Sequence, residues 1–368
     1  MGKIDELIQQ YCPEGVEYKP LGKVCLMERG TSATKGTMQS GEIPVISGGR
    51  QPSFYCNQSN RTGETITVAG SGAGAGYVQY WNEPIFVCDA FSIKGSDNII
   101  TKFVYYFLAS IQEQIYSTKK GGGVPHVHIS SIDKFEIPLP PLPVQEAIVN
   151  ILDRFTVYAA ELQAELQARQ QQYEYYRDTL LSFEGREDVQ WKKLGEVADL
   201  GTGSHNTQDG LSEGKYPFYT RGSEILYLNN YDYDETAIIT AGDGAGVGKV
   251  FHFVQGKYAL HQRAYRIVPN EKIVLARFVY YYIGATFYNY IMKSSVSSSV
   301  VSIRKPMMVD YPIPVPSIEE QEKVISILDR FDTLVNDLSQ GLPAEIEARQ
   351  QQYEYYRDQL LTFKRKEV

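Results

Sequence analysis

Apolar positions alternate with a spacing of four and three residues from Ile148 to Phe183. This spacing is typical of a helix that packs along a narrow seam. It predicts one continuous helix of 36 residues, which would span roughly 54 Å at about 1.5 Å per residue. A helix of that length is expected to act as a spacer. Its seam positions include Phe155, Leu162, Leu166, Tyr173, Tyr176 and Leu180.

The same alternation returns near the C-terminus, where the stretch SQGLP interrupts it. Gly341 and Pro343 predict the end of one helix and the start of another, because proline suits a first helical turn and not an interior. The seam positions on either side are Phe331, Leu338, Tyr353, Tyr356 and Leu360. Two helical elements of similar period predict an antiparallel coiled coil that separates two globular parts.

An internal repeat accounts for both seams. The stretch ARQQQYEYYRD occurs at 168–178 and again at 348–358. YKPLGKV in the first copy matches WKKLGEV in the second, and GSGAGAGYV matches GDGAGVGKV. ILDRF occurs in both copies. Repeats at a fixed period indicate tandem copies of one structural unit. We predict five segments: an N-terminal helical segment (1–17), a first module (18–140), a central helical spacer (141–190), a second module (191–316) and a C-terminal helical region (317–368).

The modules themselves predict short strands, loops and few helices. ETITVAGSGAGAGYVQYW and ETAIITAGDGAGVGKVFHF each indicate a strand, a glycine-rich turn and a returning strand. Neither turn fits GxGxxG or the phosphate-binding Walker pattern. Glycines here favour a tight turn or close approach to a flat polymer. The fold class is therefore α+β, with two tandem globular domains separated by long helices.

Composition supports a globular protein, since 43% of the 368 residues are apolar. No apolar run approaches the ~18 residues of a membrane span, and the charged start lacks a secretion signal. We therefore expect a cytoplasmic protein that does not associate with membranes. Each module has a net charge of +2, and the rest of the chain has a net charge of −12. The whole chain therefore has a net charge of −8. The modules are mildly basic, and tight DNA binding would require partner subunits.

Catalytic patterns are absent from the sequence. The five histidines lack HExxH spacing, and the four cysteines lack a CxxC pair, so we expect no metal site. The serine run at 294–302 lacks the GxSxG context of a nucleophile. The NPPY-type motif of adenine methyltransferases does not occur. The chain is expected to be no enzyme by itself and to hold no cofactor.

The module loops carry side chains suited to recognising DNA. Arginine, lysine, histidine, glutamine and serine contact base edges and phosphates, although solvated loops of any protein are polar. Arg50 and Arg221 are expected in matching loops of the two modules. An alternative is a coiled-coil adaptor whose modules bind protein or glycan, which the many tyrosines would suit. The candidate DNA-binding residues are Arg50, Arg61, Lys119, Lys120, His126, His128, Arg221, Lys249, His261, Gln262, Arg263, Ser297 and Arg304.

The tails PLPPLPVQEAIVNILDRF and VPSIEEQEKVISILDRF, each leading into ARQQQYEYYRD, closely resemble the DNA-specificity subunit of type I restriction-modification systems. The likeness covers essentially the whole chain. It implies that each module is a target recognition domain that reads one half of a split, asymmetric DNA site, and that the two copies are related by a pseudo-two-fold repeat. The helical tails would set the separation of the half-sites and bind two methyltransferase subunits, and the N-terminal segment would pack with the C-terminal tail.

The resemblance also gives a role to AELQAELQ, residues 160–167. Taken alone, the repeated tetrapeptide is a good helix former. In the family, a tetrapeptide of this kind varies in copy number with the length of the DNA spacer. Catalysis would belong to the partners: a methyltransferase subunit that uses S-adenosylmethionine, and restriction subunits for endonuclease cleavage and translocation with ATP and Mg²⁺.

Overall fold

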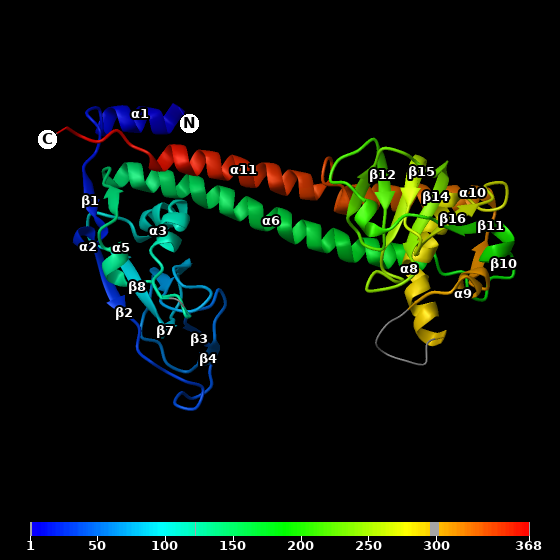
Figure 1. The fold of residues 1–368 in the computed structure, drawn as a ribbon. Helices are drawn as coiled ribbons and strands as arrows, with labels where there is room; N and C mark the ends of the chain where they lie inside the picture. The colour runs from blue at the N-terminus through cyan, green and yellow to red at the C-terminus, as the bar shows by residue number, and fades with distance from the viewer. Residues whose placement is uncertain (1, 122, 295–301, 368) are drawn as a thin grey trace. The chain divides into compact units, whose positions relative to one another are not determined.

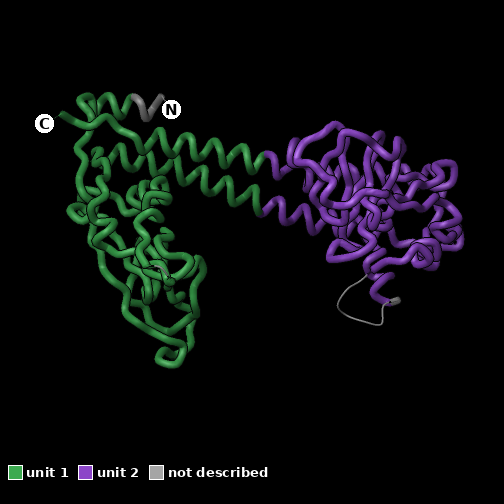
Figure 2. The backbone as a smooth tube through the Cα atoms, viewed as in Figure 1, with its two compact units in different colours: residues 1–163, 345–368 green, residues 164–344 purple. Residues whose placement is uncertain are grey.

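The structure is a computed structural model that describes residues 2–121, 123–294 and 302–367 (Figure 1). The chain forms two compact units: unit 1 contains residues 1–163 and 345–368, and unit 2 contains residues 164–344 (Figure 2). Each unit combines one globular module with parts of both helical tails. The expected α+β fold with two tandem modules is confirmed. The five segment boundaries stay predictions.

Unit 1 is built on three small sheets. Four antiparallel strands run in the order β2–β8–β5–β6, and β4–β3–β7 form a second sheet in which β3 and β7 are parallel. Strands β1 and β9 pair at the base of the module. The strands are β1 (Tyr18–Pro20), β2 (Cys25–Arg29), β3 (Ile43–Ile46), β4 (Phe54–Cys56), β5 (Thr65–Ala69), β6 (Val78–Trp81), β7 (Phe86–Val87), β8 (Ala90–Gly95) and β9 (Glu136–Pro138).

One helix covers the main sheet of unit 1. Helix α3 packs against β5, β6 and β8, and Phe103 of this helix is fully buried with Val68 and Ile93 of the sheet. Alternate strand residues and one helix face thus form a common apolar core. The helices of this module are α1 (Gly2–Tyr11), α2 (Leu21–Val24), α3 (Thr101–Ser110), α4 (Gln112–Ser117) and α5 (Ile129–Ile132).

Unit 2 repeats this plan, with one six-stranded sheet in place of the four- and three-stranded sheets of unit 1. Six strands run in the order β11–β16–β14–β15–β12–β13. The long strand β15 pairs with β14 on one side and, at its end, with β12 on the other. In unit 1 the corresponding positions are divided between β6 and β7, with Pro84 in between, which cannot donate a backbone hydrogen bond. The strands are β10 (Gln190–Lys193), β11 (Ala198–Thr202), β12 (Tyr216–Tyr219), β13 (Ile225–Leu228), β14 (Tyr233–Ala241), β15 (Phe251–Leu260), β16 (Ala264–Pro269) and β17 (Pro312–Val315).

Helix α8 (Ala276–Ser294) lies on the large sheet and contacts β14, β15 and β16 (Figure 1). Its Phe278 is buried with Ile238 and Ile267 of the sheet. Strands β10 and β17 pair antiparallel at the base of the module. The short helices of unit 2 are α7 (Leu194–Val197), the 3₁₀ helix η1 (Thr207–Asp209) and α9 (Lys305–Val309). None of the helices among the described residues is long and apolar enough to cross a membrane.

The tails form three helices, α6 (Leu142–Leu180), α10 (Ile318–Asn336) and α11 (Leu342–Leu361). In unit 1, α6 and α11 are antiparallel, since Phe155 packs on Tyr353 and Tyr356 while the Tyr158 hydroxyl donates to Glu345 at 3.1 Å. In unit 2, α6 packs against α10 through aromatic contacts with Phe331. The antiparallel pairing and the helix break expected at SQGLP are confirmed.

Two expectations about the tails are wrong. Helix α6 begins at Leu142 and ends at Leu180, so Phe183 is not a helical seam residue and lies instead in the core of unit 2, 2% exposed. Leu338 is 75% exposed and lies in the turn between α10 and α11. This turn forms because the Asp337 carboxylate accepts a hydrogen bond from the Ser339 N–H at 2.7 Å. Val335, 2% exposed, occupies the last seam position of α10.

A fully buried glutamine fastens each module to its own tail. Gln145 of α6 accepts from the Ile100 N–H at 2.8 Å and donates to the carbonyls of Asn98 and Pro140 at 3.1 and 2.7 Å. Gln321 of α10 makes the same three contacts in unit 2, with the Leu275 N–H and the carbonyls of Ile273 and Pro316. These bonds satisfy backbone groups at the start of α3 and α8 and fix the helix–module junction.

The aspartate of ILDRF adds a second tie in each copy. The Tyr106 hydroxyl donates to Asp153 at 2.5 Å, and the Tyr281 hydroxyl donates to Asp329 at 2.5 Å. A cation joins each aspartate from the same module helix, Lys102 in unit 1 at 2.8 Å and Arg277 in unit 2 at 2.8 Å. The retention of ILDRF in both copies therefore has a structural reason.

The N-terminal segment packs with the C-terminal tail inside unit 1. Leu7 and Ile8 of α1 pack against the cluster that contains Leu360 and Phe363. The backbone of Val16 bonds to Lys364 and Lys366 at 2.9 Å each. The end of α11 and the residues that follow it therefore pack against the N-terminal segment and the core of the first module.

Candidate nucleic-acid interface

The glycine-rich turns bring a second loop of each module against the hairpin. A Cβ atom at Gly74 would lie 2.3 Å from the carbonyl oxygen of Gly48, and one at Gly246 would lie 2.3 Å from that of Arg221. Only glycine permits this close approach. The loops after β3 and β12 therefore match, as expected. Gly48 is the counterpart of Arg221, and Arg50 lies two positions further along the loop.

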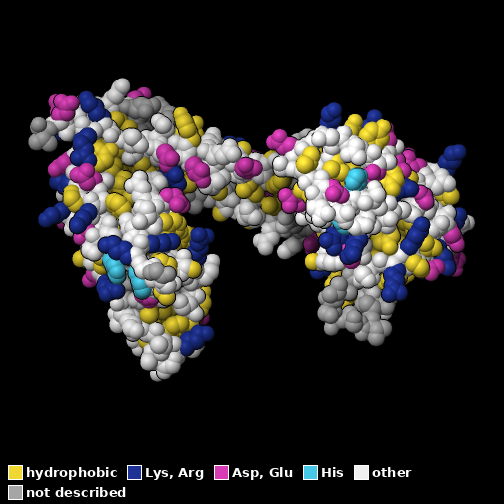
Figure 3. All heavy atoms as spheres, viewed as in Figure 1, with side chains coloured by type: hydrophobic (Ala, Val, Ile, Leu, Met, Phe, Trp, Pro, Cys, Tyr) yellow, Lys and Arg dark blue, Asp and Glu magenta, His cyan; other side chains and the backbone are white. Residues whose placement is uncertain are grey.

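In unit 1, basic side chains lie over aromatic rings near the hairpin. The Arg50 guanidinium is 4.9 Å from the centroid of Tyr77, and the Lys119 ammonium is 4.0 Å from that of Tyr116. The exposed rings of His126 and His128 are parallel, with centroids 6.2 Å apart. The backbone of Lys120 pairs with that of His126. Figure 3 shows histidine and basic side chains close together on the visible face of unit 1.

In unit 2, one carboxylate organises two arginines. Asp243 accepts from Arg221 at 2.8 Å and from Arg263 at 2.9 Å. The hydrogen bond from Arg221 is the main reason why the pKa of Asp243 lies below its usual value. The Arg263 side chain is nevertheless 63% exposed. Two cations held in fixed directions at a surface suit the recognition of phosphates or guanine.

Three further candidates lie at the surface of unit 2. The Lys249 ammonium is 5.2 Å from the centroid of the Tyr288 ring. The Gln262 amide donates to Asn206, and the exposed Arg304 directly precedes α9. Ser297 lies outside the described residues. The contacts of all these residues with DNA stay predictions.

Two further candidates, Arg61 and His261, make contacts inside their own modules, and their contacts with DNA stay predictions. Arg61, whose side chain is 15% exposed, donates to the Ser92 hydroxyl and to the carbonyls of Asn60 and Arg29. His261 is 4% exposed and its Nδ1 accepts from the Arg263 N–H at 3.0 Å. Burial lowers the pKa of His261 below its usual value, so the ring is a neutral support for the Arg263 backbone.

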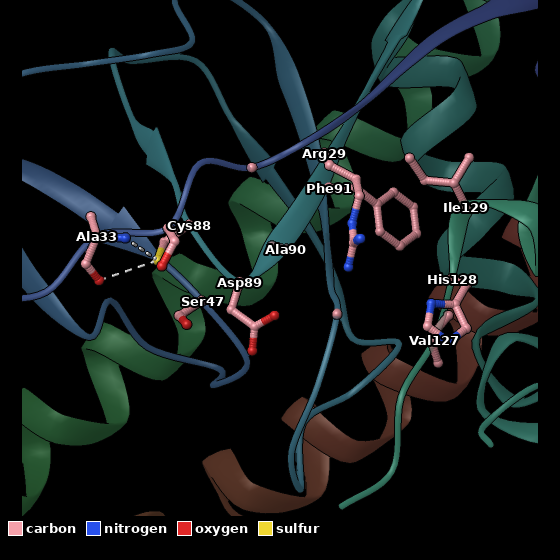
Figure 4. Close-up of a pocket in the computed structure, with 13 residues that line it drawn as sticks. Arg29, Ala33, Ser47, Cys88, Asp89, Ala90, Phe91, Val127, His128 and Ile129 are labelled. Atoms are coloured by element: carbon pink, nitrogen blue, oxygen red, sulfur yellow. Dashed lines mark hydrogen bonds between the residues drawn. The ribbon is translucent and has the colours of Figure 1, made fainter. Parts of the chain in front are cut away.

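A cavity of about 570 Å³ lies beside the hairpin of unit 1 (Figure 4). Figure 4 shows the Arg29 guanidinium, the Asp89 carboxylate and the His128 ring among the side chains that line it. The sequence reasoning missed Arg29 and Asp89, and it missed Asp243 in unit 2. Comparing GSGAGAG with GDGAGVG could have drawn attention to Asp243, because an acidic residue in a surface turn invites a basic partner. The residues that the structure describes contain no cluster of His, Cys, Asp or Glu that could hold a metal.

Comparisons with known proteins agree with this arrangement. The chain matches the family described as the type I restriction modification DNA specificity domain twice, over residues 13–169 and 186–348. It is 33% identical to the specificity subunit of the type I restriction enzyme EcoR124I/EcoR124II from Escherichia coli, with 96% of each chain covered. It is 28% identical to a putative type I restriction enzyme specificity subunit from Haemophilus influenzae, covering 95% of this chain and 96% of that one.

Two solved structures share the fold. A type I restriction-modification S subunit from M. genitalium superposes with a TM-score of 0.69 at 19% identity, covering 94% of this chain and 96% of that one. A chain from a study of assembly and conformational transition of the type I restriction-modification system gives a TM-score of 0.57 at 17% identity, covering 95% and 98%.

The chain therefore belongs to the family of type I restriction-modification DNA specificity subunits and carries two copies of the family's domain. Its role is DNA specificity, and catalysis lies in the other subunits of the system. Family membership implies DNA and a methyltransferase as partners.

Proposed function

We propose that each module reads one half of a bipartite, asymmetric site in double-stranded DNA. The helical tails set the separation of the halves and dock two copies of one methyltransferase subunit, and restriction subunits join this complex in the cytoplasm. S-adenosylmethionine, Mg²⁺ and ATP are used by these partners. The chain itself supplies specificity and assembly.

The observation that carries the proposal is that one exposed helix face has the same residues in both tails. Within ARQQQYEYYRD, the same positions are exposed in both copies, and these positions do not lie on the apolar seam. Tyr175 is 67% exposed and Tyr355 is 61% exposed. Their rings meet the following tyrosine in the same edge-on geometry, at 5.6 and 5.4 Å. The exposed positions are Ala168, Gln170, Gln171, Glu174, Tyr175 and Asp178, with Ala348, Gln350, Gln351, Glu354, Tyr355 and Asp358 in the second copy.

Exposed side chains without an internal role are free to differ between repeats, whereas identical partners require identical surfaces. The hairpin turns behave in the opposite way, since Ser71 in one module stands where Asp243 stands in the other. Identical tails and divergent reading surfaces suit two equal methyltransferase subunits on a DNA site with two different halves.

The test is adenine methylation mapping in a methylation-free host that expresses the chain with its methyltransferase subunit. A split motif is expected only when this chain is present. Exchanging residues 18–140 for the corresponding module of a relative should change one half of the motif and leave the other unchanged.

The control strain expresses the methyltransferase subunit alone. If the two proteins form a complex but no split motif appears, the chain is an adaptor and the DNA-reading proposal fails. A motif that changes in both halves after exchange of one module would contradict the assignment of one half-site to each module.

A further inference from the structure

The two modules contain cavities at the same place. The cavity in unit 1 has a counterpart of about 220 Å³ in unit 2, lined in part by Thr202, Asp243 and Arg263. In unit 1 the Gly70 N–H donates to the Asp89 carbonyl at 3.0 Å, and in unit 2 the Gly242 N–H donates to the Arg263 carbonyl at 2.8 Å. These bonds make Asp89 and Arg263 structural counterparts.

The segment on the other side of each glycine is also shared. The Val127 N–H donates to the Gly70 carbonyl at 3.0 Å, and the Ile303 N–H donates to the Gly242 carbonyl at 2.8 Å. Both Asp89 and Arg263 directly precede a strand of the main sheet, β8 or β16. The backbone that positions these two side chains is therefore the same in both modules.

The side chains on this common frame have opposite charge. In unit 1 the Ser71 hydroxyl donates to the Asp89 carboxylate. In unit 2 Asp243 takes the place of Ser71 and accepts from Arg263 at 2.9 Å. Asp89 and Arg263 are both exposed. The donor and acceptor roles of the two positions are thus exchanged between the modules.

Arg263 differs from an arginine that only supports the fold. The Arg266 side chain is 15% exposed and lies between Asp199 and Glu235. The Arg263 side chain is 63% exposed, and Asp243 engages only its Nη1. A guanidinium has five donors in a planar fork, so several N–H groups of Arg263 remain for a ligand. Ser71 likewise engages one oxygen of Asp89, and a carboxylate offers about four acceptor positions.

These side chains match different base edges in the major groove. An aspartate accepts from the amino group of cytosine, and arginine donates in bidentate fashion to O6 and N7 of guanine. Resting on the function proposed above, we infer that Asp89 and Arg263 are corresponding base-reading residues of the two modules. Asp89 reads the amino group of a cytosine in one half-site, Arg263 reads a guanine in the other, and Asp243 is a positioning residue for Arg263.

The test uses variants that keep a polar side chain and alter its hydrogen-bonding pattern. In R263Q the glutamine favours adenine, and in D89N the asparagine does so too. Each variant is expressed with the methyltransferase subunit, and methylated sites are mapped. The matched controls are K272Q and D97N, which change exposed residues at the opposite end of β16 and β8.

We expect each variant to weaken base preference by about tenfold or more at a single position. For R263Q that position is a guanine in one half-site, and for D89N it lies in the other half-site. The untouched half of the motif reports on folding and assembly in the same experiment. The control variants should give the wild-type motif.

An unchanged motif in both variants overturns the inference while the function proposed above stands. Loss of all methylation in R263Q and in D89N also overturns it, because the cavities would then serve the fold or assembly. Absence of any motif with the wild-type chain refutes the function proposed above, and the inference falls with it.

Discussion

The ring of Phe155 packs on Tyr356 with centroids 5.7 Å apart, and Phe331 packs on Tyr176 with centroids 5.4 Å apart. In each contact the phenylalanine comes from ILDRF of one copy and the tyrosine from ARQQQYEYYRD of the other. Each module therefore uses the tail of its neighbour in the repeat to complete its helical base. This reciprocity explains why the two stretches match so closely.

Truncating either phenylalanine should have a similar cost. F155A and F331A each remove a partly buried ring from contacts with two tyrosines, and we expect a loss of about 2 kcal/mol in the free energy of unfolding. Urea unfolding followed by circular dichroism measures this loss. V157A is the control, because Val157 is 57% exposed on α6. A neutral result for one phenylalanine and a large loss for the other would contradict the reciprocal arrangement.

The buried glutamines give a second prediction. Q145L and Q321L each leave one backbone N–H and two carbonyls without their side-chain partner. Buried polar groups that lose their partners cost about 1–3 kcal/mol each, so each variant should lose about 3 kcal/mol or more of stability.

Hydrogen exchange at Ile100 and Leu275 locates this effect, since their N–H groups should lose protection in Q145L and Q321L respectively. Q163L, at an exposed position of α6, serves as the control for the loss of an amide. Full protection of Ile100 in Q145L would show that the glutamine does not hold this junction.

His252 gives unit 2 a dependence on pH, whereas a similar contact in unit 1 is made by a glutamine, which does not titrate. The His252 Nε2–H donates to the Gly222 carbonyl at 3.2 Å, and Gln79 of unit 1 donates to the Arg50 carbonyl at 2.9 Å. Burial lowers the pKa of His252 below its ordinary value of 6.5. The unfolded chain therefore binds the proton more readily, and stability falls as the pH drops below 6.5.

In H252Q the hydrogen bond can form with an amide that does not titrate. We expect the loss of stability between pH 7 and pH 5 to be smaller than in the wild type. It should not vanish, because His261 also has a lowered pKa. Urea unfolding at several pH values measures the difference. Identical pH dependence in both proteins would refute the role given to His252.

Local patterns in the sequence predicted the elements whose causes are local. Phe155, Tyr173 and Tyr353 were placed on seams by their spacing, and the two hairpins followed from strands that flank glycines. These features depend on neighbours within a few turns of helix or one turn of chain.

Contacts between distant residues could not be predicted in this way. Arg61 resembles a free loop cation until the fold brings Ser92 to its Nε at 2.8 Å. His261 is buried because Phe218 of another strand lies against its ring. Asp243 gains its two arginines from loops about twenty residues away on either side. Each case depends on tertiary packing that no local pattern encodes.

The outward tyrosines should determine binding of the methyltransferase. Y175A and Y355A each remove an exposed aromatic side chain, the type of residue that most often dominates interfaces. We expect each single variant to bind one methyltransferase subunit in place of two, and the double variant to bind neither at concentrations that saturate the wild type. Native mass spectrometry gives the stoichiometry.

Because both rings are largely exposed, the thermal unfolding of the chain alone should change little. V157A again serves as the control. The corresponding residue in the second copy is Thr333, so this exposed position is not identical in the two tails. Wild-type stoichiometry in the double variant would place the docking surface elsewhere.

The repeated tetrapeptide gives the last prediction. AELQAELQ lies within the uninterrupted helix α6, and its Leu162 and Leu166 are 6% and 9% exposed. A third AELQ would lengthen α6 by about 6 Å and turn the following residues by roughly 40° beyond a full turn. Since base pairs are spaced by about 3.4 Å, the gap between half-sites should grow by one or two base pairs.

Methylation mapping of the insertion variant reads this gap directly. Both half-sites should keep their sequences, because the insertion leaves the two modules unchanged. A variant in which the second AELQ is replaced by AQLE keeps the length and should keep the wild-type gap. An insertion that leaves the gap unchanged, or that alters a half-site sequence, would show that α6 does not set the separation.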